Sequence, residues 1–112
     1  MSTISYEQFQ AVDIRVGRII KIEPFERARN PSYKLTIDFG PELGIKHSSA
    51  QLKNDYTPQE LVQKQCLAVV NFEPRNIAGF LSEVLVLGVP KEDGGLSLVT
   101  ALDQARIGGR MY

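Results

Sequence analysis

The chain has 112 residues, of which 43% are hydrophobic and 23% are charged. These values are typical of a globular domain and exclude a disordered or fibrous chain. Thirteen basic and thirteen acidic residues give a net charge of zero, whereas dedicated nucleic-acid binders are usually basic overall. No apolar run approaches the roughly 20 residues that span a bilayer, and the first residues lack a signal-peptide pattern. We therefore expect a cytoplasmic protein with one domain, residues 1–112, and no membrane insertion.

The N-terminal third of the chain changes from a helical to a strand pattern. Residues 3–12 are expected to form a short helix, with Thr3 or Ser5 as its N-cap. From residue 13 the apolar residues recur at every second position, which predicts a long half-buried strand over 13–23. Gly17 would allow a bulge in that strand, and Pro24 is expected to end it.

The middle of the chain predicts two short strands and a helical segment. Residues 35–39 and 45–48 are expected as the second and third strands. Ser49 is interpreted as the N-cap of a helical turn. Thr57 and Glu60 are spaced as a capping box, with a proline at the first helical position between them. We therefore expect the segment 49–63 to be helical.

The second half predicts the remaining strands of the fold. Residues 67–72 form a fourth strand, and Pro74 and Gly79 bracket a short irregular connection. The apolar run within 82–89 predicts a fifth strand that is buried on both faces, and a hairpin turn leads to a returning strand over 96–102. This order predicts an all-β fold with short helices, namely a five-stranded Greek-key OB-fold β-barrel with N- and C-terminal extensions.

The sequence offers no set of residues that would make a catalytic or metal centre. Cys66 precedes an apolar run and is interpreted as a small buried hydrophobe. His47, Ser48 and Ser49 are adjacent, and a strand sends neighbouring side chains to opposite faces, so they do not form a triad. One histidine and one cysteine are too few for a recognisable zinc site. We expect a protein that is not an enzyme and uses neither cofactor nor metal.

Three blocks of sequence carry a family resemblance. The block Asp13–Ile19 reads D-I-R-V-G-R-I, and the block Tyr33–Gly40 is similar to the second strand of the same family. The longest block is Asn71–Gly88. In this order they resemble the tRNA-binding OB domain family over about residues 10–105. The family includes free-standing tRNA-binding proteins and modules attached to aminoacyl-tRNA synthetases.

Two phrases, Ile45–Leu52 and Arg75–Phe80, resemble a free-standing branch of this family whose members are export-linked chaperones. This resemblance implies a homodimer that holds unfolded or precursor polypeptides and works with the protein-export machinery. The tRNA-binding members usually carry Ser-x-x-Met, and here Leu85 replaces that methionine after Ser82. Together with the neutral net charge, this departure favours polypeptide binding, and tRNA is the alternative partner.

The candidate binding residues fall into two groups. The first is a polar and aromatic group in the longest block, in which an exposed Phe72 would stack on a base or grip an apolar side chain. The alternative is that the aromatic rings belong to the core and the asparagines to turns. The second group is a basic set that would line one face of the barrel or simply face solvent. Its members are Arg15, Arg18, Arg27, Arg29, Lys34, Lys46, Lys53 and Arg75. The expected binding surface consists of Asn71, Phe72, Arg75, Asn76 and Ser82, flanked by Lys34, Lys46 and Ser48.

Overall fold

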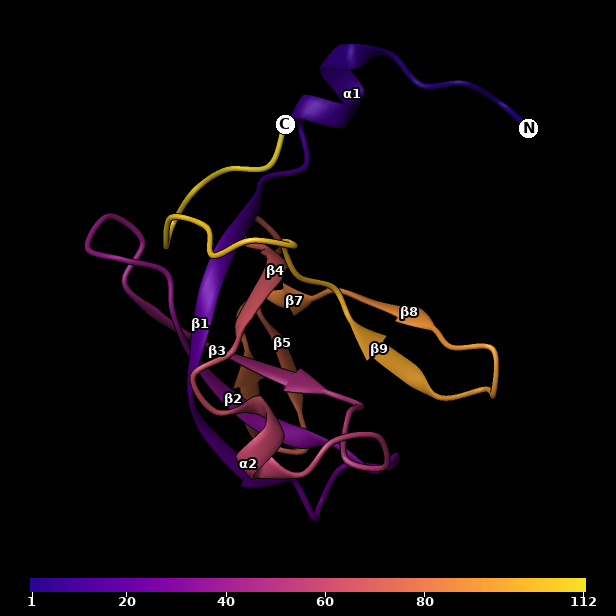
Figure 1. Cartoon of the computed structure of the whole chain (residues 1–112), viewed down its shortest axis with the longest axis vertical. Coiled ribbons are helices and arrows are strands. Elements are labelled where there is room, and N and C mark those ends of the chain that lie inside the picture. Colours follow the sequence, from indigo (N-terminus) through magenta and orange to yellow (C-terminus); the bar gives the residue numbers. More distant parts are fainter.

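A computed structural model describes residues 1–112, and its centre is a five-stranded antiparallel sheet that curls into a nearly closed barrel (Figure 1). The expected OB-type barrel is confirmed. The strand order in the sheet is β3-β2-β1-β4-β7. The bounds are Ile14–Pro24 for β1, Tyr33–Asp38 for β2, Ile45–Ala50 for β3, Gln65–Val69 for β4 and Leu85–Val86 for β7.

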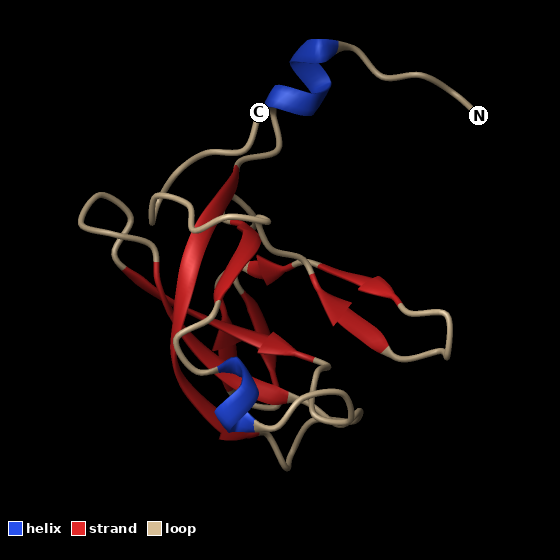
Figure 2. Ribbon diagram, viewed as in Figure 1, coloured by secondary structure: helices blue, strands red, loops and turns tan.

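Two hairpins and two short helices surround the barrel (Figure 2). The hairpins are β5 (Arg75–Ile77) with β6 (Phe80–Ser82), and β8 (Gly88–Pro90) with β9 (Leu96–Leu98). The helices are α1 (Tyr6–Gln10) and α2 (Pro58–Leu61). Neither helix is long and apolar enough to cross a membrane. Helix α1 lies beyond one end of β1, close to the C-terminus, whereas α2 lies at the opposite end of the barrel (Figure 1).

Strand β1 departs from the strict alternation expected from the sequence. Its register against β2 shifts between Ile19 and Lys21, which marks a bulge. Ile20 is the extra residue, so the inward-facing position changes from Ile19, which is fully buried, to Ile22, which packs partly buried against the core. Gly17, where a bulge was expected, instead lies at a point of close packing.

Both helices begin with capping boxes: the one at Thr57 was predicted, and for α1 the N-cap is Ser5, one of the two expected residues. The Ser5 hydroxyl accepts a hydrogen bond from the Gln8 amide, and Thr57 pairs in the same way with Glu60. The helices are shorter than expected, because 3–12 contains only Tyr6–Gln10 and 49–63 contains only Pro58–Leu61. The interpretation of Ser49 as a helix N-cap was wrong, since its backbone continues β3 and pairs with Lys34.

The segment after β4 is more ordered than the expected irregular connection. Ile77 pairs with Phe80, so residues 78–79 form a two-residue hairpin turn. Ala78 and Gly79 both have positive φ angles, as the type I′ turn requires. The predicted single strand over 82–89 is broken into β6, β7 and β8. Burial on both faces was also wrong for this run, because Leu85 and Val89 are exposed while Val84 is buried.

The C-terminal tail is part of the fold. Gly108 and Gly109 exchange backbone hydrogen bonds with Val16, and Met111 donates to the Ile14 carbonyl. The tail therefore adds a short antiparallel segment to β1, because β2 pairs only with the far half of β1, from Arg18 onward. This covers backbone groups that would otherwise form an open edge. The core inside the barrel is built chiefly from Ile19, Leu35, Ile37, Phe39, Leu61 and Cys66.

Candidate functional site

The β5–β6 hairpin is held against β3 at two points. The amide of Ser49 donates a hydrogen bond of 3.0 Å to the Ser82 hydroxyl. Next to it, His47 and Glu83 are joined through backbone and side chain. The Phe80 ring packs edge-on against Phe25, with ring centroids 5.4 Å apart. The hairpin therefore packs firmly against the barrel, and two hollows lie along it.

One hollow has a volume of about 570 Å³ and lies between the hairpin, the β4–β5 connection and the end of β3. We call it the Phe72 hollow. Phe72 is 54% exposed at its rim, and Ser82 lines it as a nearly buried residue. Arg75 also lines it, together with the carboxylates of Glu73 and Glu83. The hollow therefore combines an exposed aromatic ring with charges of both signs.

A second hollow, of about 390 Å³, lies beside the first. We call it the Arg29 hollow. Arg29 comes from the loop between β1 and β2, and Arg75 faces it from β5. Its apolar lining comes largely from residues 85–87 and Leu96, at the junction of β7 with the β8–β9 hairpin. A lining of arginines and apolar side chains can bind an apolar side chain that lies next to an anionic group.

Of the eight residues expected to form the binding surface, the structure brings three into the Phe72 hollow, namely Phe72, Arg75 and Ser82. Phe72 is exposed rather than part of the core, which is the condition the functional interpretation required. Arg75 is exposed and has no ion-pair partner. These three residues make up the central part of the candidate site.

The flanking residues lie elsewhere. The ammonium group of Lys34 lies 5.0 Å from the Phe25 ring centroid and 5.3 Å from that of Phe80, so cation–π contacts hold it. Lys46 lies on β3, outside both hollows. Ser48 is fully buried, and its hydroxyl donates to the Ser49 carbonyl at 3.2 Å. In this arrangement Lys34 and Ser48 support the hairpin and β3.

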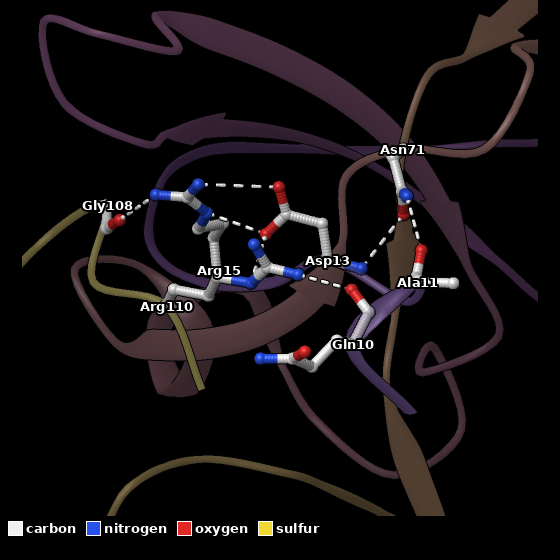
Figure 3. Close-up of polar contacts among 7 residues, drawn as sticks. All are labelled: Gln10, Ala11, Asp13, Arg15, Asn71, Gly108 and Arg110. Carbon is white, nitrogen blue, oxygen red and sulfur yellow. Dashed lines mark hydrogen bonds and ion pairs between the residues drawn. The ribbon is translucent and has the colours of Figure 1, made fainter. Parts of the chain in front are cut away.

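The two asparagines make local backbone contacts. The Asn76 side chain accepts a hydrogen bond from the Gly79 amide and so shapes the hairpin turn. The Asn71 side chain accepts from the Asp13 amide at 3.0 Å and donates to the Ala11 carbonyl at 2.8 Å (Figure 3). Asn71 thereby connects the end of β4 to the segment that leaves α1.

Figure 3 also shows a cluster of charges that ties the two termini together. The Asp13 carboxylate accepts from Arg15 at 2.7 Å and lies 3.5 Å from Arg110. The hydrogen bond to Asp13 raises the pKa of the Arg15 guanidinium. Arg15 also donates to the Gly108 carbonyl, and Arg110 to the Gln10 carbonyl. These contacts give Arg15 a structural role in place of the ligand contact considered for the basic set.

Sequence reasoning missed several residues of the site. Glu73, Glu83, Ile77 and Leu85 line the Phe72 hollow but were not among the expected binding residues. Of the basic set, Arg29 and Arg75 line the hollows, whereas Arg18 bonds to the Gln63 carbonyl. No group of three histidine, cysteine, aspartate or glutamate side chains is arranged to hold a metal ion.

A nearly closed OB-type barrel with an open groove beside a docked hairpin defines a binding domain of the OB class. The family model described as "Putative tRNA binding domain" matches residues 14–110. The chain belongs to this tRNA-binding domain family. A curated relative, the methionine–tRNA ligase of Chlorobium chlorochromatii, is 40% identical over 86% of this chain. The match spans only 13% of that ligase.

Two of the solved structures that match are similar over nearly the whole length of both chains. The CsaA chaperone protein from Picrophilus torridus is 46% identical, with a TM-score of 0.93 over 98% of this chain and 100% of that one. The chaperone CsaA from Bacillus anthracis is 42% identical, with a TM-score of 0.91 over 99% of this chain and 100% of that one. The resemblance to the chaperone branch of the family, stated from two short phrases, is confirmed.

Proposed function

We propose that this protein is a non-catalytic chaperone of the CsaA kind, which binds unfolded or export-bound polypeptides in the Phe72 hollow. The observation that carries the proposal is the composition of this hollow. Phe72, Ile77 and Leu85 offer apolar surface, and burying such surface is the main driving force for holding an unfolded chain. Full-length similarity to two CsaA structures supports the same function.

The alternative function is tRNA binding, which the family model favours. Phosphate contacts require unpaired cations, and Arg29 and Arg75 provide two. Glu73 and Glu83 lie in the Phe72 hollow beside Arg75 and would repel a phosphate backbone there. The zero net charge of the chain adds no general attraction for nucleic acid. We therefore rank polypeptides ahead of tRNA.

The experiment is a titration with an unfolded precursor protein and, in parallel, with total tRNA, at about 50 and about 200 mM salt. We expect the precursor to bind with little dependence on salt, because apolar contacts dominate. Phe72→Ala should weaken this binding about tenfold or more, given the apolar area that the ring can bury. Val62→Ala removes another exposed apolar side chain, which lines neither hollow, and should bind as the wild type does.

Two outcomes would reject the proposal. Equal client binding by Phe72→Ala and the wild type would show that the hollow is not the site. A tRNA affinity that falls by orders of magnitude with salt and is lost in Arg75→Ala would establish the alternative function.

We further propose that the protein acts as a homodimer in the cytoplasm, in contact with the export machinery. Helix α1 has no buried residue, although a five-residue helix is not stable alone in water. Ile4, Tyr6 and Tyr112 are exposed around it, and Val89 is exposed on the β8–β9 hairpin. A two-fold interface through α1, the C-terminal segment and the exposed end of the apolar run 84–89, at Val89, would cover these side chains and leave Leu85 in the hollows. Light scattering should give twice the monomer mass, and a monomer mass at micromolar concentration would reject the dimer.

A further inference from the structure

The two hollows form one groove. Ser49, Arg75, Ile77 and Leu85 line both of them, so a ligand can pass from one hollow to the other without leaving the surface. Arg75 lies at the boundary and contributes its guanidinium to each side. The charges on the two sides of Arg75 differ.

The Arg29 hollow is cationic. Arg29 and Arg75 are its charged lining residues, and no aspartate or glutamate lines it. Neither arginine takes part in any of the five ion pairs of the structure. Leu85 and Leu96 lie in the same lining. An unpaired guanidinium presents its donors in the geometry of a carboxylate, so this hollow suits an acidic side chain flanked by apolar residues.

The Phe72 hollow is acidic. Glu73 and Glu83 outnumber the single cation, Arg75. Glu83 is hydrogen-bonded to His47, whereas Glu73 is exposed and has no ion-pair partner. Glu73 and Phe72 line the same hollow. A basic side chain can therefore meet a carboxylate here while its stem lies along the aromatic ring.

We propose that the groove selects client segments by charge: an acidic residue enters the Arg29 hollow, apolar residues lie over the boundary at Arg75, and a basic residue enters the Phe72 hollow. This inference rests on the proposed function, because it specifies which polypeptides the same groove holds. It also gives a role to the arginines at one end of the groove and to the glutamates at the other, although the whole chain has no net charge.

The test uses a labelled, unstructured peptide in which one aspartate and one lysine are separated by apolar residues, with fluorescence anisotropy as the readout. In a second version asparagine replaces the aspartate, and in a third glutamine replaces the lysine. We expect each replacement to weaken binding to the wild type about fivefold, the size of a partly exposed ion pair.

Two variants assign the contacts to residues. In Arg29→Gln the preference for the aspartate peptide over the asparagine peptide should shrink, because only Arg75 remains in that hollow. In Glu73→Gln the lysine and glutamine peptides should bind nearly equally, because Glu83 is bonded to His47. Arg27→Gln is the matched control for the first variant, because Arg27 is an exposed arginine on the same loop that lines neither hollow. Glu92→Gln is the control for the second, since Glu92 is exposed on the distant hairpin turn. Both controls should keep the full discrimination of the wild type.

The outcomes separate this inference from the proposed function. If all three peptides bind equally well and Phe72→Ala weakens all of them, the groove holds polypeptides without charge selection, and only this inference fails. If none of the peptides binds, the proposed function fails with it. If Arg29→Gln weakens tRNA binding but leaves the three peptide affinities unchanged, the arginines bind the phosphates of tRNA and the inference is rejected.

Discussion

Glu83 and His47 face each other across the gap between β3 and the end of β6, joined at three points. The Glu83 amide donates to the His47 carbonyl at 2.8 Å, and the His47 amide donates to Glu83 Oε1 at 3.0 Å. His47 Nδ1 lies 3.1 Å from the same oxygen. This arrangement keeps the β5–β6 hairpin, and with it Arg75, in place beside the barrel.

We expect Glu83→Ala to weaken binding in the groove, because the hairpin loses its side-chain connection to β3. The free energy of unfolding should fall by about 1 kcal/mol, the net value of a typical hydrogen bond. Glu83→Gln keeps an oxygen that accepts from the His47 amide and should restore most of both quantities. Urea unfolding and client titration measure them. Equal defects in the two variants would show that the negative charge matters more than the hydrogen bond.

Gly17 marks the position where β1 packs most closely against its neighbours. A Cβ there would contact the Ile37 side chain and lie 2.7 Å from Phe39 Cε1, and both residues are fully buried. We expect Gly17→Ala to lower the free energy of unfolding by about 1–3 kcal/mol through overpacking. Gly44→Ala is the comparison, since Gly44 has a φ of +79° and nothing within 4 Å, and it should lose about 1 kcal/mol through backbone strain alone. Chemical denaturation gives both values.

Cys66 is expected to be unreactive in the native protein. Burial raises the pKa of its thiol from the ordinary value of 9.0 to about 12, so the nucleophilic thiolate is scarce at neutral pH. A maleimide should modify it slowly at pH 8 and rapidly in denaturant. The unfolded chain releases this proton at a lower pH than the folded chain does. The thiol therefore adds stability that is complete below pH 9.0 and is lost as pH rises toward about 12.

Asn71 was expected in the binding surface, but its side chain makes structural hydrogen bonds, and a substitution can show which role it has. Asn71→Ala removes the hydrogen bonds to Asp13 and Ala11, so we expect α1 to detach from the end of β4. The free energy of unfolding should fall by about 1–2 kcal/mol, and self-association should weaken, because α1 is a proposed dimer element. Analytical ultracentrifugation and urea unfolding are the measurements. A variant that stays dimeric and stable but loses client binding would show that Asn71 belongs to the binding surface after all.

The sequence by itself determined several features of this protein. The capping box at Thr57 predicted where α2 begins, because an N-cap hydroxyl and the amide it satisfies lie three residues apart. For α1 the sequence left Thr3 and Ser5 as alternative N-caps, and Ser5 is the one used. The alternation after residue 13 predicted β1, and the family blocks predicted the OB barrel. The polar and aromatic block predicted the Phe72 hollow in part, through Phe72, Arg75 and Ser82.

Only the tertiary structure decided which of these side chains reach solvent. Ser48 and Lys34 lie on strands as expected, yet one is buried and the other is held between Phe25 and Phe80. Arg29 joins Arg75 only because the loop after β1 and strand β5 meet beside the closed barrel. Burial depends on contacts between segments far apart in the chain, and a one-residue bulge such as that between Ile19 and Lys21 reverses inward and outward faces. The hydrophobic pattern therefore determines that a barrel forms, whereas strand register and hairpin docking decide where its groove lies.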